Sequence, residues 1–261
     1  MNIEKKHTDV RSLRSLRETY GAPAFYNEKT GKLKKLNEHY WAARFARTTN
    51  VIYQEGCFWK YDGRSGLWIK ASEPTLMNQM SRAIIHRHEQ FAEKVTTSFL
   101  RDVLTQWKGQ SVNREMVPPS RPFIHVQNGV LEFLNGEWQL LPFSPDYFGR
   151  NQLPVSFDPE ARYDRFLNEL LLTAMTEDDV QTLRQYMGQC LLGRNISQTF
   201  LILSGTPGGG KGTLVNVIEQ LIGRDNSVEL RTNCLTGRFE VGRYLGKKIL
   251  IGRDVPPDFL Q

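Results

Sequence analysis

The chain has 261 residues, of which 39% are hydrophobic and 24% are charged, and its formal net charge at pH 7 is +6. This composition is ordinary for a soluble globular protein, and the length gives room for about two domains. Because the sequence has no run of 18 or more apolar residues, we expect no membrane-spanning helix, and the first seven residues lack the apolar core of a secretory signal.

The three cysteines, Cys57, Cys190 and Cys234, lie far apart and form no CxxC pair. This spacing excludes a metal site built from cysteine ligands. We expect unpaired thiols in a reducing cytosol.

Much of the excess positive charge lies in the first 36 residues, which hold nine Lys and Arg against four acidic residues. Apolar residues at helical spacing predict a short helix over 9–20, and Pro23, Gly31 and the cluster Lys32–Lys35 indicate a linker after it. A basic segment fits a phosphate backbone as its partner, and it fits a solvated tail equally well. Deletion of residues 1–36 tests the first alternative, since it would weaken single-stranded DNA binding and flatten its salt dependence.

Residues 38–155 predict a mixed α+β domain. Helices are expected over 39–47 and within 74–107, and strand-forming runs between and after them are broken by turn-forming pairs. These pairs are Glu55-Gly56, Asp62-Gly63, Asn128-Gly129 and Asn135-Gly136. The last two predict a β-meander over 123–141.

The many aromatic residues of this region could stack on bases, but a small domain also needs them for its core. We expect core packing for all six: Tyr53, Phe58, Trp59, Tyr61, Trp68 and Trp138. His86 and His88 are two positions apart on an expected helix, so they point to different faces and make a poor metal pair.

After Pro154 the pattern changes to alternating helices and strands. Helices are expected over 163–175, 178–192 and 213–222, and Thr176–Asp179 is a capping sequence for the second of them. Residues 199–204 are almost wholly apolar, which predicts a buried central strand of a parallel sheet, and a final strand is expected over 248–251.

Between the expected strand and helix lies a glycine-rich segment with P-loop spacing. Its residues are Gly205, Thr206, Pro207, Gly208, Gly209, Gly210, Lys211, Gly212 and Thr213. Glycines let backbone N–H groups turn toward phosphates, the following helix adds its dipole, and the lysine contacts the β- and γ-phosphates. The segment therefore predicts a nucleotide site that takes ATP, with Lys211 also acting in catalysis.

Magnesium binding departs from the usual pattern. Gly212 stands where most P-loops have the Ser or Thr whose hydroxyl binds Mg²⁺, and Thr213 follows one place later. We therefore expect Mg²⁺ to be held by nucleotide oxygens, water and an acidic residue. Asp254, at the end of the last expected strand, is the candidate for that metal ligand and for a catalytic carboxylate that orients the attacking water. Thr213 is the second candidate metal ligand. Asp258 is a weaker alternative to Asp254, and we expect Arg253 to be an exposed strand-end residue.

Three sets of motifs resemble one known family, the poxvirus-type and phage or plasmid primase-helicases. The first is Trp59–Gly63 with Gly66-Leu67-Trp68; the second is 127–132 followed by 143–146, 153–155 and 157–159; the third is the P-loop with Tyr244–Ile251. The second set is the most specific, because four short elements recur in order.

The resemblance implies a basic arm and linker over 1–37, a helicase-associated α+β domain over 38–155 and an AAA+-like superfamily III motor over 156–261 with a parallel-sheet core. It also implies an ATP-driven DNA helicase in phage or plasmid replication, working in the bacterial cytoplasm as a hexameric ring on single-stranded or forked DNA, with a primase and other replication proteins as possible partners. The family's sensor strand, DNA-contacting loop and arginine finger would follow Gln261.

Two other functions stay open. The chain could be a truncated, catalytically weak protein that binds ATP and DNA. The run Gly210–Thr213 also resembles the loop of adenylate kinases, but such a kinase needs many more residues after this loop than the 48 found here.

Overall fold

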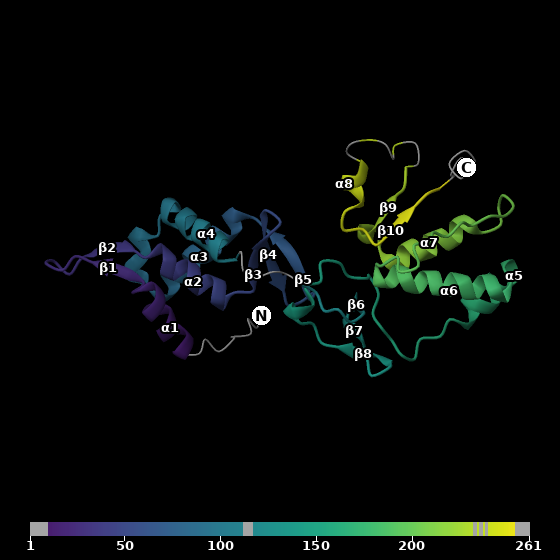
Figure 1. The fold of residues 1–261 in the computed structure, drawn as a ribbon, viewed down its shortest axis with the longest axis horizontal. Helices are drawn as coiled ribbons and strands as arrows, with labels where there is room; N and C mark the ends of the chain where they lie inside the picture. The colour runs from purple at the N-terminus through teal and green to yellow at the C-terminus, as the bar shows by residue number, and fades with distance from the viewer. Residues whose placement is uncertain (1–9, 112–116, 232–233, 235–236, 238–239, 254–261) are drawn as a thin grey trace. The chain divides into compact units, whose positions relative to one another are not determined.

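The computed structural model describes residues 10–111, 117–231, 234, 237 and 240–253. The chain divides into two compact units. The N-terminal unit comprises residues up to 62 and 68–118, and the C-terminal unit comprises 63–67 and the residues from 119 onward (Figure 1). The boundary at residue 155 expected from the sequence falls inside the second unit, so as a division between functional domains it stays a prediction.

The described residues of the N-terminal unit form four helices, two small sheets and a 3₁₀ turn. Its helices are α1 (Val10–Tyr20), α2 (Glu38–Thr48), α3 (Glu73–Arg87) and α4 (Thr97–Ser111), and its strands are β1 (Ala24–Tyr26), β2 (Leu33–Leu36), β3 (Val51–Gln54), β4 (Cys57–Asp62) and β5 (Leu67–Ala71). Strands β1 and β2 form an antiparallel hairpin, and β3, β4 and β5 lie in that order in one sheet. The three-stranded sheet confirms the turns expected at Glu55-Gly56 and Asp62-Gly63.

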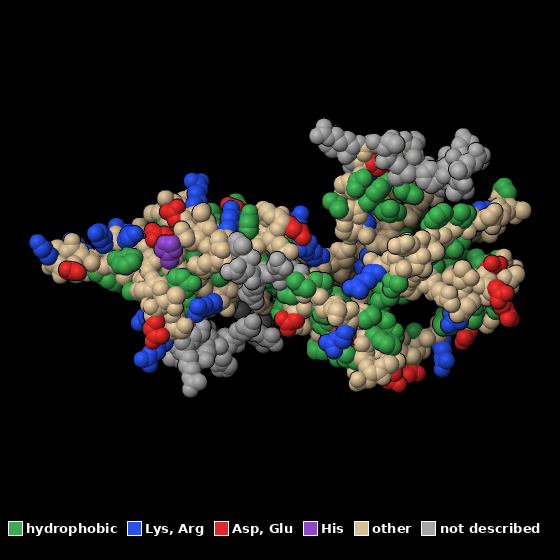
Figure 2. Space-filling view, in the orientation of Figure 1, with side chains coloured by type: hydrophobic (Ala, Val, Ile, Leu, Met, Phe, Trp, Pro, Cys, Tyr) green, Lys and Arg blue, Asp and Glu red, His purple; other side chains and the backbone are tan. Residues whose placement is uncertain are grey.

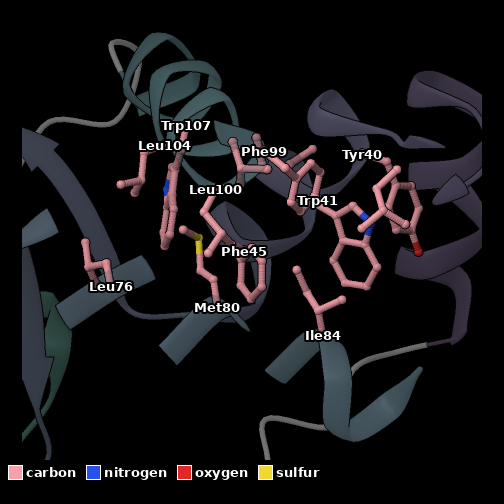
Figure 3. Packing of buried hydrophobic residues seen from close by; sticks show 14 of the residues in the cluster. Tyr40, Trp41, Phe45, Leu76, Met80, Ile84, Phe99, Leu100, Leu104 and Trp107 are labelled. Carbon is pink, nitrogen blue, oxygen red and sulfur yellow. The ribbon is translucent and has the colours of Figure 1, made fainter. Parts of the chain in front are cut away.

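Aromatic side chains fill the core of this unit, with α2 at its centre (Figure 3). The ring of Phe45 on α2 stacks on Trp107 of α4 at a centroid distance of 5.9 Å, and Trp41 is almost completely buried. Burial of such large rings is the main favourable contribution to folding in a small unit. The prediction of core packing is confirmed for Phe58, Trp59 and Trp68, whereas Trp138 in the other unit is 42% exposed.

The segment read as a linker is folded. Residues 24–36 form the β1–β2 hairpin, and Ala24 and Leu36 belong to the same core as Leu16 of α1. The linker interpretation is therefore wrong. Glycine and clustered lysines mark a tight turn and an exposed strand as readily as a linker, and only the buried Ala24 and Leu36 distinguish the two.

The C-terminal unit begins with the expected meander and continues with helices. Its elements are β6 (Phe123–Val126), β7 (Gly129–Leu134), β8 (Glu137–Leu141), a π-helical turn (Phe166–Leu171) continued by α5 (Leu172–Ala174), α6 (Glu177–Leu192), α7 (Lys211–Ile222), β9 (Ser227–Glu229), α8 (Glu240–Tyr244) and β10 (Ile249–Ile251). Thr176 and Asp179 form a capping box at the start of α6, as the sequence indicates. The core packs β6 and β7 against α6 and α7.

The described residues around the glycine-rich loop do not form the parallel sheet expected from the sequence. The described residues contain one parallel pair, β9 with β10. Residues 199–204 form no strand; Phe200 and Ile202 are 73% and 56% exposed, and only Leu201 and Leu203 pack on the core. The expectation of a buried strand is wrong here, because an apolar run becomes a central strand only where ladder partners lie on both sides of it.

A half-buried lysine connects the last strand to α6. Lys248, which precedes β10, donates from Nζ to the carbonyl of Leu191 at 3.1 Å. Gly193 ends α6 at φ 66°, and a Cβ atom placed there would lie 3.2 Å from that Nζ. Burial lowers the pKa of Lys248.

Candidate nucleotide-binding site

The glycine-rich loop leads directly into α7, which begins at Lys211, two residues before the start expected from the sequence. Gly208 and Gly210 have φ values of 79° and 82°, a region that side chains with a Cβ disfavour. The N–H of Gly209 donates to the carbonyl of Thr206 at 3.2 Å and closes the turn. Gly210, the residue before the helix, makes no side-chain cap, so no side chain at this position satisfies the first N–H groups of α7.

Lys211 folds back over the loop. Its Nζ donates to the carbonyl oxygens of Gly205 at 2.8 Å and of Thr206 at 2.9 Å. The ammonium group therefore lies beside the loop backbone, at the helix end where the dipole also favours an anion.

The loop is open on its outer side. A Cβ atom added at Gly205, Gly208, Gly210 or Gly212 would meet nothing within 4 Å. Thr213 lies exposed in the first turn of α7. Phosphate oxygens could thus approach the loop amides and Lys211 together, and the residues that could hold the phosphates of a nucleotide are those of 205–213.

The end of β10 lies against α7. Arg253 donates from Nη2 to Asn216 Oδ1 at 3.0 Å and to Glu219 Oε2 at 3.1 Å. The sequence indicates an exposed strand-end arginine, and Arg253 is half-exposed but paired to the helix. Asp254 and Asp258 lie outside the described residues, so the expected metal ligand stays a prediction.

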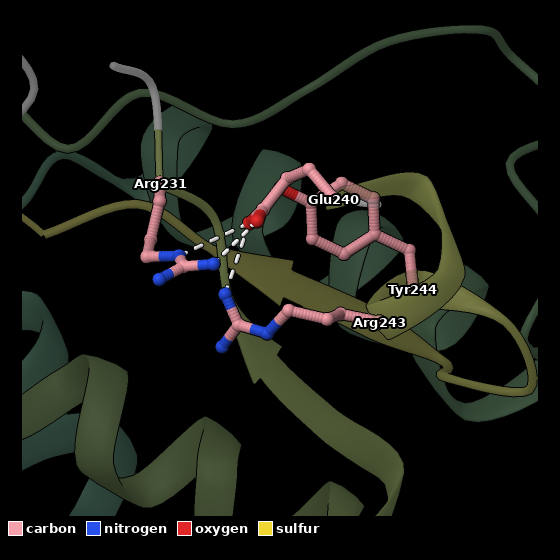
Figure 4. Close-up of polar contacts among 4 residues, drawn as sticks. All are labelled: Arg231, Glu240, Arg243 and Tyr244. Atoms are coloured by element: carbon pink, nitrogen blue, oxygen red, sulfur yellow. Dashed lines mark hydrogen bonds and ion pairs between the residues drawn. The ribbon is translucent and has the colours of Figure 1, made fainter. Parts of the chain in front are cut away.

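A cluster around Glu240 was not found from the sequence (Figure 4). Glu240 is 5% exposed and accepts hydrogen bonds from Arg231, from Arg243 Nη1 at 2.9 Å and from the Tyr244 hydroxyl at 2.9 Å. The hydrogen bond from Arg231 is the largest cause of a Glu240 pKa of about 2, with smaller contributions from Tyr244 and Arg243. No periodic spacing links position 231 to position 240, so only the fold shows this cluster.

A second polar cluster includes His125 of β6 and Glu132 of β7. Burial, with a smaller effect from the charge of Lys248, lowers the pKa of His125 to about 4. Neither ring nitrogen of His125 has a hydrogen-bond partner in the part of the chain that the structure describes. Nearby, the Tyr147 hydroxyl donates to Glu132 Oε2 at 2.8 Å, and Arg121 Nε lies 2.7 Å from Glu132 Oε1.

The described residues also bear on the expectations for metal ligands, cysteines and membrane-spanning helices. There, no three His, Cys, Asp or Glu side chains gather where they could hold a metal ion. His88 stacks on Phe91 at a centroid distance of 5.0 Å. Cys57, Cys190 and Cys234 are all unpaired, as expected. Within the same ranges, no helix is both long and apolar enough to cross a membrane.

Comparison with known proteins gives one family. The model of the family described as "D5 N terminal like" matches residues 16–172, well over half of the chain. No curated protein sequence gives a significant match. The matched range covers the first two motif sets of the resemblance and ends before the glycine-rich loop. The chain therefore belongs to the D5 N-terminal-like family, the N-terminal domain of D5-like primase-helicases of DNA replication.

Proposed function

We propose that this chain binds ATP at residues 205–213 and that it is part of a DNA helicase of phage or plasmid replication. The observation that carries the proposal is the glycine-rich loop that runs into α7, with Lys211 hydrogen-bonded across it. The family membership supports the replication context.

In this proposal the loop amides and the N-terminus of α7 bind the nucleotide phosphates. Lys211 exchanges its two carbonyl acceptors for the β- and γ-phosphate oxygens, where its charge stabilises the negative charge that develops during hydrolysis. Bound Mg²⁺ would neutralise the phosphates further, with Thr213 and Asp254 as candidate ligands. Hydrolysis would take place in a hexameric ring that moves along single-stranded DNA.

The test is nucleotide affinity, measured with a fluorescent ATP analogue, followed by DNA-stimulated ATPase activity. Lys211→Ala should abolish most of the affinity, whereas Lys94→Ala, which removes an exposed lysine from the other unit, should leave it unchanged. Equal affinity in the wild type and in Lys211→Ala would overturn the proposed nucleotide site.

A second candidate function is that of a non-catalytic partner in a replication complex. The observation that favours it is the absence of a parallel sheet around the loop in the described residues. Nucleotide binding that depends on Lys211, together with background hydrolysis at all DNA concentrations, would select this candidate over the motor.

A further inference from the structure

The β1–β2 hairpin exposes aromatic and basic side chains together. Phe25 is 41% and Tyr26 is 51% exposed. The lysines of the hairpin are all exposed: Lys29, Lys32, Lys34 and Lys35. Figure 1 shows the hairpin extending beyond the helices of its own unit, and Figure 2 shows Lys and Arg side chains over the same region. Exposed rings on a protruding hairpin add little to the core and thus point to another role.

The hairpin is held firmly at its base. The side-chain Nδ2 of Asn37 donates to the carbonyls of Tyr20 at 2.7 Å and Ala22 at 2.9 Å. The indole N–H of Trp41, in the core, donates to the carbonyl of Pro23 at 3.0 Å. The strands therefore leave the core in one fixed direction.

The tip of the hairpin is ordered by its own sequence. The side-chain oxygen of Asn27 accepts hydrogen bonds from the backbone N–H of Lys29 at 2.9 Å and of Thr30 at 3.0 Å. Gly31 has φ 65° and donates its N–H to the carbonyl of Asn27 at 2.8 Å. A ligand would therefore find these side chains already positioned, which reduces the entropic cost of binding.

Most of the positive charge is not neutralised within the fold. The ammonium groups of Lys29, Lys32 and Lys34 form no ion pair with any side chain in the described ranges. Lys35 lies 3.9 Å from Glu38 and also 5.4 Å from the centre of the Phe25 ring. Since Lys35 pairs with Phe25 across the two strands, a positive charge and an aromatic face lie side by side.

We propose that the β1–β2 hairpin is a binding site for single-stranded DNA. The lysines contact phosphates, and Phe25 and Tyr26 stack on unpaired bases, the combination that binds single strands without sequence preference. A duplex offers the same phosphates but keeps its base faces stacked, so the aromatic pair favours single strands. The choice of DNA rests on the proposed replication function, but the binding requires no nucleotide.

The test measures the anisotropy of a fluorescein-labelled oligothymidylate with the full chain, without ATP. Phe25→Ala/Tyr26→Ala should weaken binding at least about five-fold, as expected when base stacking is lost. Lys29→Gln/Lys32→Gln/Lys34→Gln should lower the slope of log affinity against log salt by about 2, at about 0.7 per lost phosphate contact.

Matched controls remove the same chemistry elsewhere. Phe133→Ala/Trp138→Ala removes another exposed aromatic pair from the β7–β8 hairpin, and it should leave binding unchanged. A triple variant removes equal charge from the exposed helical surface of the N-terminal unit and should keep most of the salt slope: Arg82→Gln/Lys94→Gln/Arg101→Gln.

Two results would overturn the proposal: equal loss of affinity in the hairpin and control variants, or tighter wild-type binding to a duplex or to phosphatidylglycerol vesicles than to the oligothymidylate. The oligothymidylate assay contains no ATP, and the affinity for the fluorescent ATP analogue is measured without DNA. A failure of the nucleotide site and a failure of the hairpin site are therefore distinguishable.

Discussion

Arg253 and Glu219 join the end of β10 to α7 through an ion pair, with Arg253 Nη2 3.1 Å from Glu219 Oε2. Because α7 begins at Lys211, this pair helps to hold the end of the last strand against the helix that carries the candidate nucleotide site. The side chains of Arg253 and Glu219 are 47% and 29% exposed, so solvent screens their attraction.

The Arg253–Glu219 pair should therefore contribute little to stability. In a double-mutant cycle of Arg253→Ala and Glu219→Ala, we expect a coupling free energy below about 1 kcal/mol, as for other partly exposed pairs. Urea unfolding at low and high salt measures it, and the coupling should shrink as salt is added. A coupling of several kcal/mol that is independent of salt would contradict this prediction.

Gly210 and Gly212 should respond oppositely to alanine. Gly210 has φ 82° and Gly212 lies within α7, and a Cβ atom at either position meets nothing within 4 Å. Gly210→Ala should destabilise by about 1–2 kcal/mol through the left-handed backbone alone. Gly212→Ala should stabilise by up to about 1 kcal/mol through helix propensity. Urea midpoints compare the two variants, and a shift in the same direction for both would refute the backbone argument.

Gly149 leaves room for the His125 ring. A Cβ atom at Gly149 would lie 2.4 Å from Cε1 and 2.7 Å from Nδ1 of that buried imidazole. Gly149→Ala should therefore destabilise the C-terminal unit by about 1–3 kcal/mol. In a His125→Ala background, Gly149→Ala should lower the free energy of unfolding much less than it does in the wild type. Additive effects of the two changes would show that the ring is not the obstacle.

His125 should make the stability of the C-terminal unit depend on pH. Its pKa is lowered to about 4 by burial, whereas an unfolded chain has a histidine pKa near 6.5. The unfolded state binds the proton more readily, so the stabilisation is complete above pH 6.5 and is lost as pH falls toward 4, a loss of up to roughly 3 kcal/mol. Hydrogen exchange of α6 against pH measures this dependence, and His125→Phe should flatten it between pH 6.5 and 4.

Glu240 should make stability depend on pH in a more acidic range than His125 does. Its pKa is lowered to about 2, mainly by the hydrogen bond from Arg231, so its contribution is complete above pH 4.5 and is lost as pH falls toward 2. Glu240→Gln should accelerate hydrogen exchange in α8 at neutral pH and remove the pH dependence of α8 exchange below 4.5. Unchanged hydrogen exchange in α8 would contradict the prediction, because it would mean that the ion pairs of Glu240 with Arg231 and Arg243 do not stabilise this helix.

The sequence predicts well those elements whose signals are local. The capping residues Thr176 and Asp179 mark the start of α6, and the two Asn-Gly pairs mark the meander, because each depends only on neighbours in the chain. Residues 199–204 have the apolar composition of a central strand. Whether they pair depends on partners elsewhere, which periodicity does not show.

The candidate sites divide in the same way. The loop 205–213 is recognisable because its chemistry requires adjacent residues. The cluster of Arg231, Glu240 and Tyr244, and the pairing of Phe25 with Lys35, require a turn or a chain reversal that brings separate residues together. The family match covers residues 16–172 and does not include the loop, so the proposal for the loop rests on its sequence and geometry.

The hydrogen bond from Lys248 to the carbonyl of Leu191 makes the end of α6 depend on a residue far along the chain. The two residues are 57 positions apart, yet the lysine supplies a positive charge where the helix dipole is negative. Gly193 alone can stop the helix, but the part-buried Leu191 carbonyl gains this hydrogen bond only when the later segment is in place. The hydrogen bond at the last turn of α6 therefore requires the docking of β10, and we expect these two parts of the unit to become stable together.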